Sequence, residues 1–436
     1  MWNRRHFLAA ATGSAFAQPS VSARPNVVLF LVDDMGYADL GCYGARDIAT
    51  PHIDRLAKEG VRLTDCYSNG PVCTPTRCGL LTGRYQQRFG LEWALGPGMK
   101  GYGLAAENHI IARYLKDAGY RTGMFGKWHL GYEPEVGPNR HGFDEFAGLL
   151  SGNVDHYSHK EINGEEDWYQ NTQPQKVNGY STELIRDRAV QFIETHAKSP
   201  FFLYVPFNAV HWPFQRPGKL NDVRMRPTWF DGTREGDYKP MLESVDSAIG
   251  QVLAVLQRHK LANNTLVIFT NDNGGERLSD NRPFFHHKGT LWEGGIRVPA
   301  IVRWPARLPA GKVSRQAAIS MDFAATIAAA CGVTADTRQP FDGINLLPML
   351  EGKQMEQERT FFWRINRADR KQRACRRGKW KWISDAGSPQ LFDLTQDPAE
   401  RRDVSWQDPE RARAMEALVD GWEAELKKNP PPRVIA

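Results

Sequence analysis

Several features are scarce or missing in this chain of 436 residues. The apolar run near the N-terminus is too short to span a bilayer, and no later apolar run is long enough. Stable membrane insertion is therefore not expected. Basic residues exceed acidic ones by only six, and no basic tract is present, which argues against nucleic-acid binding. Internal repeats and low-complexity segments are also missing. The composition is therefore that of a globular protein, long enough for one large domain and a smaller one.

Cysteine is sparse as well. The six cysteines are too few and too widely spaced to form a disulfide framework, and no pair has the Cys-x2-Cys spacing of a zinc site. Each must therefore be interpreted from the residues around it. They are Cys42, Cys66, Cys73, Cys78, Cys331 and Cys375.

Residues 1–17 are interpreted as an export signal. Arg4 and Arg5 precede a short alanine-rich run that ends in the small-x-small pattern of residues 15–17. The segment resembles a twin-arginine signal, which implies the twin-arginine export machinery as a partner and folding before translocation. The expected destination is the periplasm or the extracellular space of a bacterium. A general secretory signal with two chance arginines is the alternative.

Continuous apolar runs rich in β-branched residues alternate with helical segments along most of the chain. Such runs are typical of parallel strands that are buried on both faces. The alternation predicts an α/β fold, a three-layer α/β/α sandwich around a large, mixed, mainly parallel sheet. Strands are expected at residues 24–32, 201–205, 265–270 and 300–303, and helices at 53–59, 110–118, 182–196 and 322–330.

The pattern changes after about residue 350. Residues 379–383 alternate polar and apolar side chains, as an antiparallel strand does, and a short strand and a terminal helix follow at 390–394 and 411–427. We therefore expect a catalytic domain at residues 24–350 and a smaller antiparallel sheet-and-helix subdomain at 351–436.

Polar side chains follow two of the predicted strands. Asp33 and Asp34 come directly after the first apolar run, and Asp272 and Asn273 come shortly after the run that begins at residue 265. Ligands of open α/β sheets bind beyond the carboxyl ends of the strands, so these side chains are expected to converge. Their oxygens suit a hard divalent cation, either Ca²⁺ or Mg²⁺.

Cys73 begins the sequence Cys-Thr-Pro-Thr-Arg, and Leu-Thr-Gly-Arg follows at residues 81–84. Pro75 suits the first turn of a helix and Thr74 could cap it, so Cys73 is expected at a helix N-terminus, where an anion is stabilised. Taken alone, so short a pattern also fits a buried structural cysteine. The two motifs together resemble the signature of type I sulfatases, in the alkaline phosphatase superfamily.

The resemblance implies a particular chemistry at residue 73. In that family a formylglycine-generating maturation enzyme oxidises the cysteine, and the hydrated aldehyde attacks the sulfur of a sulfate ester. Arg77 is then expected to hold the formylglycine and offset its charge, a task for which a rigid guanidinium suits better than lysine. The family's metal, Ca²⁺, would be bound by Asp33, Asp34, Asp272 and Asn273, with an oxygen of the converted Cys73.

Three further motifs match the family. In Gly-Lys-Trp-His, Lys127 is expected to contact the sulfate and His129 to hydrogen-bond the formylglycine diol. His211, in Asn-Ala-Val-His-Trp-Pro, matches the histidine that protonates the leaving oxygen, a task that suits an imidazole. Lys288, which begins Lys-Gly-Thr-Leu-Trp-Glu-Gly-Gly, matches a second sulfate-binding lysine. Lys127, His211 and Lys288 are thus the expected substrate contacts.

The match covers most of residues 24–410 and has two departures from the family pattern. Thr76 replaces the commoner serine and keeps a hydroxyl. Cys78 directly follows the motif, and it could either compete as a thiol during maturation or form a disulfide. Residues 89–103 and 152–171 are expected to shape the pocket, with His286 and His287 as pocket wall or substrate contacts.

The resulting hypothesis is a sulfatase that hydrolyses esters of sulfated carbohydrates. One alternative is a phosphonate monoester or phosphodiester hydrolase of the same superfamily, since some of these use a similar motif and metal site. The other is an exported carbohydrate-binding protein with an unmodified site. For either carbohydrate hypothesis, four tryptophans could stack on sugars: Trp93, Trp128, Trp212 and Trp292.

Overall fold

The computed structural model describes residues 24–219, 222–224 and 227–428. The expected export signal at residues 1–17 lies outside the described residues. No helix in the described part of the chain combines the length and the apolarity needed to cross a membrane.

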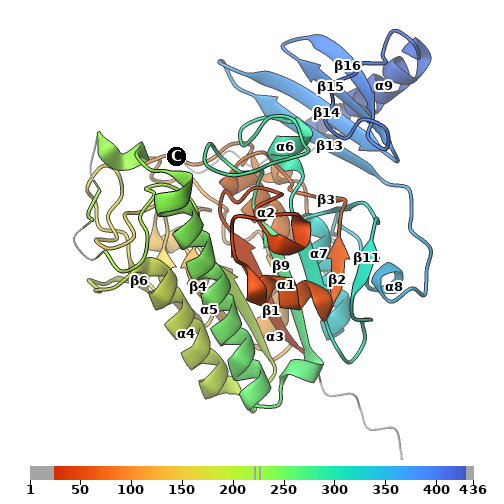
Figure 1. The fold of residues 1–436 in the computed structure, drawn as a ribbon. Helices are drawn as coiled ribbons and strands as arrows, with labels where there is room; N and C mark the ends of the chain where they lie inside the picture. Colours follow the sequence, from red (N-terminus) through yellow and green to blue (C-terminus); the bar gives the residue numbers. More distant parts are fainter. Residues whose placement is uncertain (1–23, 220–221, 225–226, 429–436) are drawn as a thin grey trace, which may run out of the picture.

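A large mixed sheet forms the centre of the molecule (Figure 1). The pairings at its centre are parallel, whereas β10 pairs antiparallel with both of its neighbours and β6 and β7 extend the opposite edge antiparallel. The order of the ten strands is β11 (Lys312–Ser314), β2 (Val61–Leu63), β10 (Ala300–Arg303), β9 (Thr265–Asn271), β1 (Asn26–Val32), β8 (Phe201–Pro206), β4 (Arg121–Lys127), β5 (Glu145–Leu149), β6 (Tyr169–Gln170) and β7 (Gln173–Pro174).

Helices cover both faces of this sheet. Val28 and Phe30 of β1 pack into one apolar core, while Leu29 and Leu31 pack into the other, because successive side chains of a strand point to opposite faces. Both cores exclude water, which explains why β1 is an unbroken apolar run. The first core contains α1 (Pro51–Lys58), α4 (Ser181–His196) and α5 (Lys239–Arg258), and the second contains α2 (Cys73–Thr82), α3 (Ile111–Asp117) and α7 (Met321–Cys331).

A second, four-stranded antiparallel sheet follows, with α9 (Pro409–Lys428) packed on it, at the upper right of Figure 1. The predicted fold class, a three-layer sandwich with a smaller antiparallel sheet and helix, is therefore confirmed. The second sheet contains β13 (Thr360–Asn366), β14 (Lys371–Arg377), β15 (Trp380–Asp385) and β16 (Ser388–Asp393); short elements elsewhere are β3 (Cys66–Tyr67), β12 (Ala318–Ile319), α6 (Glu293–Ile296) and α8 (Leu347–Leu350).

A buried ion cluster joins the small sheet to α6 and β3. Lys381 Nζ on β15 lies 3.0 Å from Glu293 Oε1 and 2.8 Å from Glu400 Oε1, and all three side chains are shielded from water. Glu293 also accepts hydrogen bonds from the Tyr67 hydroxyl at 2.6 Å and from Arg297 Nη1 at 3.1 Å. Buried charges persist only when they are paired in this way.

The same junction holds the segment that leads into α6. Gln372 Oε1 on β14 accepts a hydrogen bond from the Leu291 amide at 2.8 Å, and Glu400 Oε2 accepts one from the Glu293 amide at 2.6 Å. These two amides lie three and five residues after Lys288. The small sheet therefore fixes the backbone next to a residue of the expected site.

Lys381→Met should lower the free energy of unfolding by about 3–5 kcal/mol, because it leaves buried Glu400 without its cationic partner and Glu293 with Arg297 alone. The measurement is urea denaturation followed by tryptophan fluorescence. Lys379→Met is the matched control: Lys379 pairs with Asp393 at the surface, where such a pair contributes less than about 1 kcal/mol. Equal losses in the two variants would contradict a special role for the buried cluster.

Candidate active site

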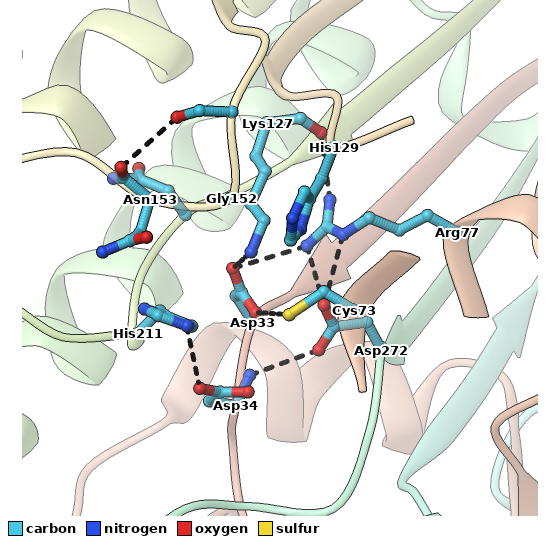
Figure 2. A network of polar contacts seen from close by, with 12 residues as sticks. Asp33, Asp34, Cys73, Arg77, Lys127, His129, Gly152, Asn153, His211 and Asp272 are labelled. Carbon is cyan, nitrogen blue, oxygen red and sulfur yellow. Dashed lines mark hydrogen bonds and ion pairs between the residues drawn. The ribbon is translucent and has the colours of Figure 1, made fainter. Parts of the chain in front are cut away.

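Strand ends and one helix N-terminus meet at the carboxyl edge of the large sheet (Figure 2). Asp33 and Asp34 follow β1, Asp272 and Asn273 follow β9, and Lys127 ends β4. The structure brings the two acidic pairs together: the Asp34 amide donates to Asp272 Oδ1 at 3.3 Å, and Asn273 Nδ2 donates to Asp34 Oδ1 at 2.7 Å.

Cys73 is the first residue of α2, and its Sγ lies 3.4 Å from Asp33 Oδ1. Burial raises the pKa of the Cys73 thiol. The expectation that Thr74 caps the helix was wrong, because the helix already starts at Cys73 and Val72 occupies the capping position. Thr74 instead joins two other segments: its hydroxyl donates to the His129 carbonyl at 3.0 Å and accepts from the Leu95 amide at 3.1 Å.

Arg77, one turn further along α2, has a fully buried side chain. Its Nε and Nη2 donate to Asp272 Oδ2 at 3.2 and 2.8 Å, and its Nη1 donates to the Lys127 carbonyl at 3.0 Å. Burial alone would raise the pKa of Asp272, but the charges of Arg77 and Lys127 together outweigh it and the pKa falls below its usual value. Arg77 thus ties α2 to the ends of β4 and β9.

Two lysines complete the charge balance. Lys127 Nζ contacts Asp33 Oδ2 in the interior, and Lys288 Nζ lies 2.6 Å from Asp34 Oδ2 with its side chain 15% exposed. Each of the three aspartates therefore has a cationic partner, and Asp33 has a second one in Arg77, whose Nη2 lies 3.5 Å from its Oδ2. Burial, reinforced by the charge of Asp272, raises the pKa of Asp33 to about 7.

The two expected histidines each leave one ring nitrogen available. His211 Nδ1 lies 2.7 Å from the Trp212 carbonyl, so this nitrogen carries the proton and Nε2, 3.4 Å from Asp34, is the basic one. His129 Nε2 likewise donates to the Leu95 carbonyl at 2.9 Å, while its buried Nδ1 has no hydrogen-bond partner among the described residues. Burial and the neighbouring lysines hold both pKa values well below the usual range.

The residues fit a hard divalent cation. Oxygen or other ligand atoms of Asp33, Asp34, Cys73 and His211 all lie within 4.8 Å of one another. Asn273 Oδ1 is buried and has no hydrogen-bond partner within the described ranges, as expected of a metal ligand. Asp272 differs, because Arg77 occupies its Oδ2 and only its Oδ1 faces Asp34.

Not every expected residue lies at the site. Trp128 and Trp292 are 1% and 7% exposed, so the expectation that they stack on sugars was wrong: Trp128 donates to the Val136 carbonyl, and Trp292 packs in the core. Trp93 and Trp212 are half-buried, and His286 and His287 are exposed. Cys78 is a free thiol in the apolar core, as are Cys66 and Cys331.

The sequence predicts that the segment beginning at Gly152 shapes the pocket, but not that Gly152 contacts His129. A methyl group at Gly152 would lie 2.7 Å from the His129 ring, so the absence of a side chain lets the backbone approach the histidine. Figure 2 shows Gly152 and Asn153 beside Lys127 and His211. No local signal marks this contact, because it joins segments far apart in the chain.

Comparisons with known proteins agree with this geometry. Residues 25–333 match the family model described as sulfatase, and residues 282–428 match the one described as N-sulphoglucosamine sulphohydrolase, C-terminal. The N-acetylgalactosamine-6-sulfatase of Canis lupus familiaris is 36% identical over 384 residues, which cover 82% of this chain and 71% of that protein. Arylsulfatase J of Mus musculus is 35% identical over 336 residues, covering 74% of this chain and 55% of that protein.

Solved structures are similar as well. Ps i-CgsB, also solved in complex with k-i-k-neocarrahexaose, has a TM-score of 0.84 and 29% identity, covering 94% of this chain and 98% of that one. The phosphonate monoester hydrolase of Agrobacterium radiobacter has a TM-score of 0.67 and 20% identity, covering 93% of this chain and 96% of that one. The second likeness is one of fold alone.

Gly152→Ala should lower kcat for a sulfate ester, the substrate class of the relatives just described, by about 10- to 100-fold. The added methyl displaces the His129 ring, which cannot move without breaking its bond to Leu95. Gly96→Ala is the matched control, since only Met99 Sδ, at 4.0 Å, lies near a methyl group there. If both variants keep wild-type kcat, His129 does not depend on this contact.

Proposed function

Because this chain belongs to the sulfatase family and is a sulfuric ester hydrolase, we propose that Cys73 is converted to formylglycine and that the substrates are sulfated carbohydrates. The observation that carries the proposal is the position of Cys73: it begins α2, 3.4 Å from Asp33, at a cluster that includes Lys127 and Lys288. A helix N-terminus with two nearby ammonium groups stabilises a sulfate.

The names of the relatives support a carbohydrate substrate. One relative is named for N-acetylgalactosamine 6-sulfate, and a structural neighbour was solved with a neocarrahexaose. Half-buried Trp93 and Trp212 provide aromatic surface of the kind that sugars contact. Neither alternative is favoured: the likeness to the phosphonate monoester hydrolase is one of fold alone, and two of the four tryptophans proposed for sugar binding are in the core.

In the proposed mechanism, the chain's own side chains position charge and move protons. Formylglycine, when hydrated, supplies one hydroxyl to attack sulfur and a second that allows sulfate to be expelled. Lys127 and Lys288 bind the sulfuryl oxygens and stabilise the charge that develops on them. His129 Nδ1 accepts a hydrogen bond from residue 73, and His211 Nε2, the basic nitrogen, takes up a proton when the anionic sulfate binds and gives it to the leaving oxygen.

The proposed metal ligands are Asp33, Asp34, Asp272, Asn273 and an oxygen of converted residue 73. A cation held there would offset the charge of the sulfate and polarise the attacking hydroxyl. We favour Ca²⁺ because the family uses it, while the oxygen ligands also accommodate Mg²⁺. The buried, unpartnered Asn273 Oδ1 supports the assignment.

The proposal includes two partners and a destination. A formylglycine-generating enzyme would convert Cys73, and the twin-arginine machinery would export the folded chain to the periplasm or beyond. Both follow from the resemblance of the motifs at residues 73–84 and 1–17 to known signals.

Peptide mass spectrometry of residues 62–84, from a host with a formylglycine-generating system, should show a loss of about 18 Da at Cys73. Cys73→Ala should lower sulfatase activity by at least about 10³-fold, because the nucleophile is lost. Cys78→Ala, on the same helix and equally buried, is the control and should keep both the mass shift and activity within a few-fold. An unmodified thiol at Cys73 in this host would refute the mechanism.

Adding Ca²⁺ to protein whose metal has been removed with a chelator should raise Tm by a few degrees, because a ligand that binds only the folded state stabilises it. Scanning calorimetry gives this readout independently of activity. Asn273→Ala should reduce the shift, and Mg²⁺ should give a smaller one than Ca²⁺. An unchanged Ca²⁺ shift in Asn273→Ala would exclude Asn273 as a ligand.

A further inference from the structure

The turn between β13 and β14 reaches the rim of the site. Arg370, at this turn, is exposed and donates from Nη1 to the Gly289 carbonyl at 2.9 Å. Gly289 directly follows Lys288, and its amide donates to the Pro71 carbonyl at 2.8 Å, two residues before Cys73. The small sheet thus places a guanidinium one residue away from a proposed sulfate-binding lysine.

Trp93 lies at the same rim and is anchored to the opposite side of the site. Two residues further on, Leu95 accepts a hydrogen bond from His129 and donates one to Thr74. The Arg367 guanidinium lies 4.4 Å from the centre of the Trp93 ring. Trp93 also faces the Lys288 segment, because a methyl group at Gly289 would be 3.9 Å from its Cη2. Its aromatic edge and the two arginines therefore border one region.

The charge of Arg370 is not neutralised by the protein. Arg367 pairs with Asp369 at 2.7 Å, but no carboxylate among the described residues is within ion-pair distance of Arg370. The other nearby acid, Asp385, already accepts hydrogen bonds from Gln372 at 2.7 Å and Trp292 at 3.4 Å.

One further guanidinium extends the region. Arg401 stacks on Phe285 at 4.2 Å, and the imidazoles of His286 and His287 are exposed beside it. Burial, with the charges of His287 and Arg370, holds the pKa of His286 below its usual value. An anion placed here would meet guanidinium donors that the protein leaves unused.

We propose that Arg370 and Trp93, whose ring packs against Arg367, form a second anion-binding subsite, which takes a carboxylate or a further sulfate of the same saccharide beside the ester that is hydrolysed. This inference rests on the proposed function, and it narrows the substrates to saccharides with more than one anionic group. The planar guanidinium of Arg370 has five N–H donors, of which Gly289 uses one, so it can bind a carboxylate or sulfate through two parallel hydrogen bonds. Trp93 would contact the apolar face of the sugar that carries this group.

Two pairs of compounds test the subsite and identify its anion. One pair is N-acetylgalactosamine 6-sulfate alone and linked to a uronic acid; the other is glucosamine 6-sulfate and glucosamine 2-N,6-O-disulfate. In at least one pair, the compound with the second anionic group should have the lower KM. A lower KM in the uronic acid pair identifies the anion as a carboxylate, and a lower KM in the glucosamine pair identifies it as a sulfate. Arg370→Gln should raise that KM by about three- to tenfold, leaving the partner compound and 4-nitrophenyl sulfate within about twofold.

Arg377→Gln is the matched control, because Arg377 is exposed at the other end of β14, pairs with Glu358, and changes the net charge equally. Isothermal titration calorimetry then measures the affinity of the same compounds for the Cys73→Ala protein, with and without Arg370→Gln. Because Cys73→Ala lacks the nucleophile, this affinity measures binding at the subsite in the absence of hydrolysis. No preference for the second anion in either assay, or equal losses for both members of a pair, would overturn the inference. Retained binding preference with no hydrolysis by wild type would instead refute the proposed function and leave the subsite standing.

Discussion

The arrangement of the site depends on the buried ion pair between Arg77 and Asp272. Three aspartates lie close together where little water reaches them, and such a group is stable only if cations offset their mutual repulsion. Lys127 and Lys288 do this for the other two carboxylates, but flexible ammonium groups are also the groups expected to bind substrate. Arg77 is different, because its guanidinium is committed in three directions, to Asp272, to Asp33 and to the Lys127 carbonyl.

The central strands and the polar residues at their ends were predictable because local sequence determines both. β1 and β9 are buried on both faces, so they appear as unbroken apolar runs, and the acids that follow them must lie at one edge of a parallel sheet. Contacts between distant segments were not predictable. Trp128 is in the core because its indole meets the Val136 carbonyl, and Thr74 is committed to His129 and Leu95 rather than to a cap. The two-residue strands β6 and β7 carry no periodic signal at all.

The small sheet is part of the site as well as an appendage to it. Gln372 and Glu400 hold the backbone of residues 291–293, and Lys381 pairs with the Glu293 side chain. Lys288 lies just before these anchored residues and reaches Asp34 on the large sheet. Two sheets that are separate in topology therefore determine together where one lysine lies, which explains why residues near 290 and residues near 375 belong to one functional unit.

The burial of Cys73 requires that its proposed conversion precede folding. The whole of α2, including Cys73 at 2% exposure, is packed beneath neighbouring segments, and the sulfur faces Asp33 in the interior. An oxidising enzyme that must bind the backbone around this sulfur, as a small ester need not, finds every residue of α2 buried once the sheet and its helices have assembled. The proposed conversion must therefore take place on the newly made, still open chain, and a copy that folds first would keep an intact binding pocket with an inert thiol at its centre. How much active protein a cell obtains would then be decided by a race between two rates, that of the modifying enzyme and that of folding.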